Sequence, residues 1–164
     1  MGETKYGRYI ITRPKEYVEP QEWSPGGPGF LLTDKMARVM YLDDEVLSGA
    51  FYVECVWFYA PTPEGSGPEP HVHDFDEIIG FFGSDPKDPT DLCGEVELWL
   101  GDEKHTITKS CVVFVPKGLK HCPLRFVRVD KPIFHFTTGP ASKYGGRKSL
   151  NVPQKGSDAP LQPF

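Results

Sequence analysis

The feature that most restricts the fold is a series of short apolar runs, each bounded by glycine, proline or acidic residues. The run from Phe51 to Tyr59 consists almost entirely of aromatic and β-branched residues, which favour β-strands. No segment shows a convincing helical periodicity. Short strands at such intervals, separated by turns, predict a closed β-barrel or a β-sandwich. The expected strands are residues 5–11, 37–42, 51–59, 78–82, 95–100, 103–108, 111–115, 124–129 and 133–138.

The run from Ile78 to Phe82 has apolar residues at both strand parities. A half-exposed strand would alternate apolar and polar residues, so we expect this strand to be covered on both faces. In one small barrel, only a second subunit or a terminal arm can cover the outer face. The pattern therefore predicts a homodimer.

The length of 164 residues fits one domain with a substantial core. The 17 glycines and 17 prolines gather in loops and at both ends, and they fall short of a low-complexity composition. We therefore expect a single domain over residues 1–164. Its core would span about 36–138, with an irregular N-terminal arm over 1–35, a polar, extended C-terminal tail over 139–164, and a long acidic loop over 83–94.

The net charge of −5 and the absence of a basic run exclude nucleic acid as a partner. No apolar run reaches the roughly 18–20 residues that span a bilayer, so no membrane is expected. The N-terminus lacks the apolar core of a signal peptide, and the cysteines form no CxxC pair. We expect a cytoplasmic protein with four reduced thiols, at Cys55, Cys93, Cys111 and Cys122.

Three histidines and a glutamate form the candidate metal site. Residues i and i+2 share a face of a strand, so His71 and His73 lie roughly 6–7 Å apart on one side. Glu77 follows at an even offset and shares that face if the strand continues. His121 comes after a Pro116-x-Gly118 turn that leads into another strand. Three imidazoles and one carboxylate suit a divalent transition metal.

Two segments carry a resemblance to a known family. The segment Gly65-x5-His71-x-His73-x3-Glu77 resembles the first motif of the cupin family, and the segment from Ser110 to Arg125 resembles the second. The resemblance covers about residues 36–138. It implies an all-β, cupin-type jelly roll of the RmlC-like kind that holds one metal ion through His71, His73, Glu77 and His121.

Two positions depart from the family's second motif. Ser110 stands where the motif usually opens with glycine, and Arg125 stands where it usually closes with asparagine. Neither position is a metal ligand in the family. In a regular strand Arg125 shares the face of His121, four residues earlier. Its guanidinium then either binds a substrate carboxylate as a catalytic-site residue or forms a structural ion pair.

The remaining candidates are a cysteine and two histidines. Cys122 has the opposite strand parity to His121, so we do not expect it to reach the metal. His135 lies in the last apolar strand, where it is either a hydrogen-bonded core histidine or a group behind the ligands. His105 lies in a polar hairpin and should be exposed.

Four protein ligands leave two positions open on an octahedral ion, which favours catalysis over a structural role. The metal would be Fe, Mn, Ni, Cu, Co or Zn. The leading hypothesis is a dioxygenase-like reaction on a small enolisable or carboxylate substrate, with Glu77 as ligand or as base. The alternatives are a metal-dependent isomerase, lyase or decarboxylase that uses the metal as a Lewis acid, and a non-catalytic binding protein.

Overall fold

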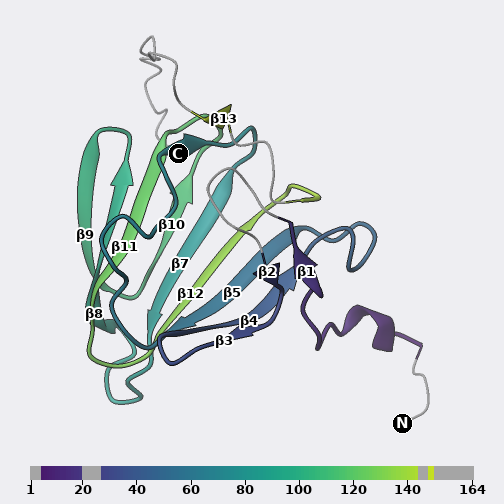
Figure 1. Ribbon diagram of the computed structural model, residues 1–164, viewed down its shortest axis with the longest axis horizontal. Coiled ribbons are helices and arrows are strands. Elements are labelled where there is room, and N and C mark those ends of the chain that lie inside the picture. The colour runs from purple at the N-terminus through teal and green to yellow at the C-terminus, as the bar shows by residue number, and fades with distance from the viewer. Residues whose placement is uncertain (1–4, 20–26, 144–147, 150–164) are drawn as a thin grey trace.

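Two antiparallel sheets face each other in the computed structural model, which describes residues 5–19, 27–143 and 148–149 (Figure 1). The first sheet has the order β10-β7-β12-β5-β4-β3, and the second has the order β13-β6-β11-β8-β9. Strands β1 (Tyr17–Val18) and β2 (Gly27–Pro28) form a separate small pair. The strands of the two large sheets are β3 (Leu31–Leu32), β4 (Met36–Leu42), β5 (Tyr52–Phe58), β6 (His71–Val72), β7 (Glu77–Gly83), β8 (Asp91–Leu100), β9 (Glu103–Lys109), β10 (Cys111–Val115), β11 (His121–Val129), β12 (Ile133–Gly139) and β13 (Lys148–Ser149).

The strands from β5 to β12 have the connectivity of a jelly roll. β5 pairs with β12, β6 with β11, β7 with β10, and β8 with β9, so that the first strand of the series lies beside the last and the two middle strands form a hairpin. The two sheets then contain β5, β12, β7 and β10 on one side and β6, β11, β8 and β9 on the other. This order is the double-sheet jelly roll of cupins and related proteins. The predicted all-β, cupin-type fold is confirmed.

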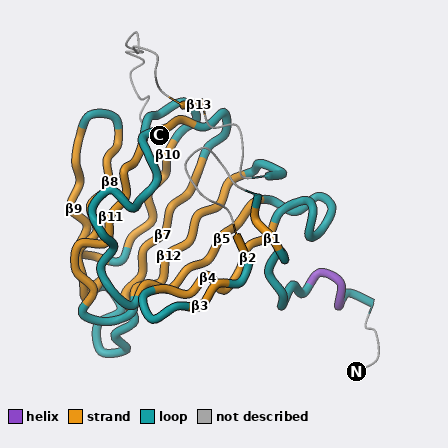
Figure 2. The backbone as a smooth tube through the Cα atoms, in the orientation of Figure 1, coloured by secondary structure: helices purple, strands orange, loops and turns teal. Residues whose placement is uncertain are grey.

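The observed strands differ from the sequence predictions at two places. Residues 5–11 do not form a strand; they contain the 3-10 helix η1 (Gly7–Tyr9) (Figure 2), and Tyr6 and Ile10 are exposed. No strand among the described residues pairs with them. The acidic loop over 83–94 is shorter than expected because β8 already begins at Asp91. Leu92 is fully buried, so burial of this side chain extends the strand. No helix in the described part of the chain has the length and hydropathy to cross a membrane.

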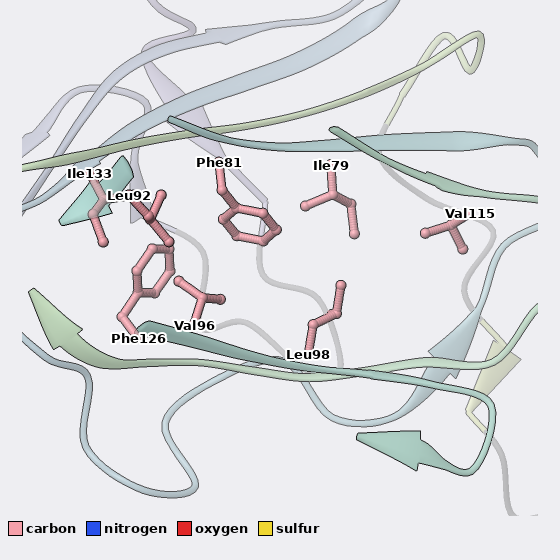
Figure 3. Close-up of a cluster of buried hydrophobic side chains, with 8 residues drawn as sticks. All are labelled: Ile79, Phe81, Leu92, Val96, Leu98, Val115, Phe126 and Ile133. Carbon is pink, nitrogen blue, oxygen red and sulfur yellow. The ribbon is translucent and has the colours of Figure 1, made fainter. Parts of the chain in front are cut away.

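The apolar core lies between the two sheets, where the side chains of both inner faces meet (Figure 3). Strand β8 contributes Leu92, Val96 and Leu98, which alternate with partly exposed residues as expected for a strand with one buried face. The ring of Phe126 stacks on Phe58 with centroids 3.7 Å apart. The cluster consists of Ile79, Phe81, Leu92, Val96, Leu98, Val115, Phe126 and Ile133.

The described part of the N-terminal arm packs against this chain itself. Val18 is buried against Tyr41, Tyr52 and Phe75, and the backbone N–H of Lys15 donates to the carbonyl of Tyr41 at 2.9 Å. The outer face of β7 and β10 is not covered by described residues, because Ile78, Val112 and Phe114 are exposed. The expectation of cover on both faces of residues 78–82 is therefore not met within one described chain.

Truncating the core should cost far more stability than truncating an exposed ring. Phe126 is 2% exposed, so Phe126→Ala should lower the free energy of unfolding by about 3–5 kcal/mol. Phe51 is 65% exposed, and Phe51→Ala should lower it by less than about 1 kcal/mol. Denaturation in urea, followed by intrinsic fluorescence, measures both. Equal losses in the two variants would contradict this placement of the core.

Candidate metal centre

Three of the four predicted ligands converge inside the barrel. His73, Glu77 and His121 each offer a ligand atom within 4.8 Å of the others, and all three side chains are buried. The Oε2 atom of Glu77 lies 3.0 Å from Nε2 of His121 and 3.5 Å from Nε2 of His73. The fold thus brings His73 and His121, which are 48 positions apart in the sequence, into one buried group with Glu77.

His71, the fourth predicted ligand, adjoins this group. It pairs with His121 across β6 and β11, and their ring centroids lie 4.2 Å apart. The ring of His73 lies 4.9 Å from that of His71. The donor group to which His71 belongs, however, contains His121 and Cys122 instead of His73 and Glu77.

Glu77 reaches the group by a different route from the predicted one. Strand β6 ends at Val72, and Glu77 begins β7 in the opposite sheet. The condition for a shared face, that the strand of His73 continues to Glu77, is therefore not met. The chain crosses from one sheet to the other between the two residues, so the carboxylate approaches the imidazoles from the facing wall.

The predicted turn before His121 is present and ties the two motifs together. The N–H of Leu119 donates to the carbonyl of Pro116 at 3.0 Å, and Gly118 has a φ of 82°, which a glycine adopts without strain. The N–H of Gly118 donates to the carbonyl of His73 at 3.0 Å. This bond fixes the start of β11 against the turn between the sheets.

Hydrogen bonds to carbonyl groups orient two of the imidazoles. Nδ1 of His71 lies 2.6 Å from the carbonyl oxygen of Glu69, and Nδ1 of His121 lies 3.1 Å from that of Leu119. A carbonyl oxygen only accepts, so each Nδ1 carries the hydrogen in these bonds. Each Nε2 then presents its lone pair, as metal-binding histidines do.

The Glu77 carboxylate is buried but ionised. Burial by itself would raise its pKa, but the close approach of the His121 and His73 imidazoles outweighs that effect and lowers the pKa to about 2. Its Oε1 atom is buried without a hydrogen-bond partner among the described residues. An unpaired buried carboxylate oxygen is costly, and a cation beside it removes that cost. The donor set therefore fits a divalent metal.

An aromatic contact that sequence reasoning missed supports His73. The ring of Phe75 stacks on His73 with centroids 4.6 Å apart and also packs against Tyr41 and Tyr52. Gly139 makes room for it, because a Cβ atom at that position would lie 2.7 Å from the Phe75 ring. Only the position of Phe75 between two ligands hints at this role in the sequence.

Polar side chains continue along the inner wall beside the centre. The Tyr52 hydroxyl is hydrogen-bonded to Thr137 and donates to Glu54 at 3.3 Å, and Glu54 is paired with Arg38 at 3.1 Å. Burial, followed by the charge of Glu54, raises the pKa of the Tyr52 phenol well above its usual range. The phenol is therefore a neutral donor on this wall.

Arg125 does not join the metal ligands. The register of β11 against β8 shifts between His121 and Leu124, so the parity argument fails. Arg125 pairs with Glu97 on the outer face and lies 3.9 Å from Glu64. It borders an outer cavity of about 310 Å³. Arg125 therefore lies outside the group of predicted ligands, with Glu64 as its charged neighbour.

The same irregularity moves Cys122 toward the ligands, contrary to expectation. Cys122 has a φ of 72° and is buried, and its Sγ belongs to a donor group with His71 and His121.

An apolar cavity of about 380 Å³, larger than the one beside Arg125, is lined by Phe58, Phe126 and ten other residues. None of these twelve residues is a predicted ligand.

His135 is a buried core histidine. Its ring stacks with Phe81 at 5.1 Å, and its Nδ1 lies 3.1 Å from the carbonyl oxygen of Gly80. Burial lowers its pKa to about 4, although the Gly80 carbonyl and the charge of Glu77 act in the opposite direction. His135 is therefore neutral in the folded protein near pH 7.

Acid should destabilise the protein through His135. The depressed pKa means that the unfolded chain binds a proton between pH 6.5 and about 4, whereas the folded chain does not. The contribution is fully present above pH 6.5 and falls by roughly 3 kcal/mol as the pH drops toward 4. His135→Phe should remove this part of the pH dependence, measured as unfolding free energies at pH 7 and pH 4.5. His105→Gln, at an exposed site, should leave it intact; an unchanged profile in His135→Phe would contradict the prediction.

Comparisons with known proteins give matches among solved structures. No family model and no curated protein matches this chain. Among solved structures, KdgF from Halomonas sp. is 16% identical, with 68% of this chain and 85% of that chain covered and a TM-score of 0.42. An RmlC-like cupin from Shewanella frigidimarina is 14% identical over 80% of this chain and 96% of that one, with a TM-score of 0.41. The polyketide cyclase RemF from Streptomyces resistomycificus is 15% identical over 88% of this chain and 89% of that one, with a TM-score of 0.45.

The class of the protein follows from its own strand order and site. It is a cupin-type jelly roll whose inner faces hold a group of histidine and glutamate side chains that could bind a metal.

Proposed function

We propose that this protein is a mononuclear metal enzyme that acts on a small organic molecule, with His71, His73, Glu77 and His121 as the ligands of one divalent transition metal. The observation that carries the proposal is the convergence of buried imidazoles from one sheet with an ionised carboxylate from the other. The carbonyl partners of His71 and His121 support it, because they hold those rings with Nε2 available.

The donor set favours a catalytic ion over a structural one. Three imidazoles and a carboxylate suit Fe, Mn, Ni, Cu, Co or Zn, and an octahedral ion with these ligands keeps two positions for water or substrate. When bound, the metal would act as a Lewis acid on a carbonyl or enolate oxygen.

The residues of the chain divide the remaining tasks. The three imidazoles hold the ion against the sheet of β6 and β11. Glu77 balances its charge from β7 and, if substrate displaces it, can accept a proton from an enolisable substrate. Phe75 keeps His73 in place and excludes water from that side. Arg125, on the outer face, has no part in this site.

Within this class we propose a dioxygenase-like reaction on an enolisable or carboxylate compound. Elemental analysis of protein purified without a metal-chelating tag would identify the native ion. Oxygen uptake with candidate enolates would then test the reaction. Turnover without oxygen would favour an isomerase, lyase or decarboxylase, and tight binding without turnover would favour a binding protein.

Removing a ligand should remove the metal. Glu77→Gln and His73→Ala should each lower the affinity for Mn²⁺ by at least about tenfold, because each deletes a direct donor. His105→Ala, which removes an exposed imidazole, should bind as the wild type does. Isothermal titration of metal-free protein measures all three. Wild-type affinity in both ligand variants would refute the assignment of the site.

We further propose that the protein forms a homodimer through the outer face of β7 and β10. In the register of these strands Phe114 lies beside Ile78, and Val112 lies beside Gly80, so the exposed apolar side chains form one patch. Contiguous apolar surface of this kind marks association sites. A second copy of the chain would give residues 78–82 the cover that their composition predicts.

A charge placed in this patch should separate the subunits. Phe114 is 59% exposed, and Phe114→Glu should give a monomer in light scattering at a concentration where the wild type is a dimer. Ile10→Glu changes a still more exposed apolar residue in the N-terminal arm and should remain dimeric. A monodisperse wild-type monomer would rule the dimer out.

A further inference from the structure

The ligand group contains one donor that the proposed enzyme does not use. The Sγ atom of Cys122 and one imidazole nitrogen each from His71 and His121 all lie within 4.8 Å of one another, and the three side chains are buried. The other thiols in the described part of the chain, on Cys55, Cys93 and Cys111, belong to no such group.

An irregularity in the backbone places the sulfur there. In a regular strand, neighbouring residues point to opposite faces, so His121 and Cys122 could not serve one ion. Cys122, however, has a φ of 72°, and the register of β11 shifts between His121 and Leu124. Two consecutive side chains therefore approach the same buried space.

The spacing is close to what one ion requires. Metal–sulfur and metal–nitrogen distances for Zn²⁺ are about 2.3 and 2.0–2.1 Å, so two such donors on one ion lie at most about 4.4 Å apart. The donor atoms here lie within 4.8 Å of one another. They must therefore approach one another by a few tenths of an ångström, or slightly more, before they can bind one ion. Such shifts are small for side chains.

We propose that His71, His121 and Cys122 form a second ligand set for a soft cation, which overlaps the set that contains Glu77. The inference rests on the proposed metal centre. Because His121 belongs to both donor groups of the structure, and His71 to both proposed ligand sets, the two kinds of ion compete for one place. Each set supplies a single anionic ligand, the Glu77 carboxylate for harder ions or the Cys122 thiolate for softer ones. Binding through sulfur releases the thiol proton to solvent.

The overlap has a chemical consequence for metal selection. A carboxylate favours Mn²⁺ and a thiolate favours Cd²⁺ or Cu⁺, while the imidazoles accept either class. The same protein should therefore bind both classes, with a different side chain completing the coordination in each case. Cys122 is then a ligand that determines which ions the centre retains.

Titration with two metals of different softness tests this. In the wild type, Cd²⁺ should bind with a thiolate-to-cadmium charge-transfer absorption, and Mn²⁺ should compete with it. Cys122→Ser should lower the affinity for Cd²⁺ relative to Mn²⁺ by at least about tenfold and abolish that absorption. Glu77→Gln should do the opposite, weakening Mn²⁺ more than Cd²⁺. Cys111→Ser, which removes a thiol outside the group, should behave as the wild type.

A second measurement uses the unaltered protein and does not depend on how variants fold. X-ray absorption at the cadmium edge of the Cd²⁺-loaded protein should show one sulfur ligand, whereas the manganese edge of the Mn²⁺-loaded protein should show only nitrogen and oxygen ligands. Absence of sulfur at cadmium, or an unchanged Cd²⁺ to Mn²⁺ affinity ratio in Cys122→Ser, would overturn the second ligand set while leaving the metal centre standing. Failure of the wild type to bind either ion would overturn the metal centre itself.

Discussion

The site depends on the passage of the chain from one sheet to the other between His73 and Glu77. Because of this crossing, the imidazoles and the carboxylate stand on facing walls and meet across the interior instead of lying in a row on one strand. The turn before His121 secures the crossing, since Gly118 donates to the His73 carbonyl and Lys117 donates its backbone N–H to Asp76 at 2.8 Å. The two motifs are thus joined by backbone hydrogen bonds as well as by their shared donors.

The surrounding fold makes such a polar group tolerable. Buried ionisable side chains are costly unless each has partners. Here His71 and His121 are hydrogen-bonded to backbone carbonyls, and the carboxylate of Glu77 lies 3.0 Å from Nε2 of His121. The apolar cluster around Phe126 lies between the same two sheets and contributes the stability that keeps this polar group buried.

Much of the fold could be predicted from the sequence because it follows from local chemistry. Aromatic and β-branched runs such as residues 51–59 formed the strands they predicted, and the turn at Gly118 has the geometry that its residues favour. The spacing of His71 and His73, and the turn just before His121, identified the metal-binding candidates in the same way. Each of these signals lies within a few residues of the sequence.

The errors arose where the path of the backbone departs from a regular strand. Parity assigned Arg125 to the interior and Cys122 to the exterior, and the register shift in β11 reversed both. The even spacing from His73 also predicted that Glu77 shares its face if the strand continues, whereas the chain passes to the other sheet before Glu77. The support that Phe75 gives to His73 depends on the absence of a side chain at Gly139, which no local pattern reveals.

The packing of Val18 links the N-terminal arm to the ligands through one aromatic cluster. Val18 packs in that cluster with Tyr41, Tyr52 and Phe75, and the ring of Phe75 stacks on His73. On the opposite side of the ligands, Ser149 of β13 pairs with His71 of β6. Both arms therefore adjoin metal-binding candidates, and untagged protein is the better choice for measurements of ion affinity.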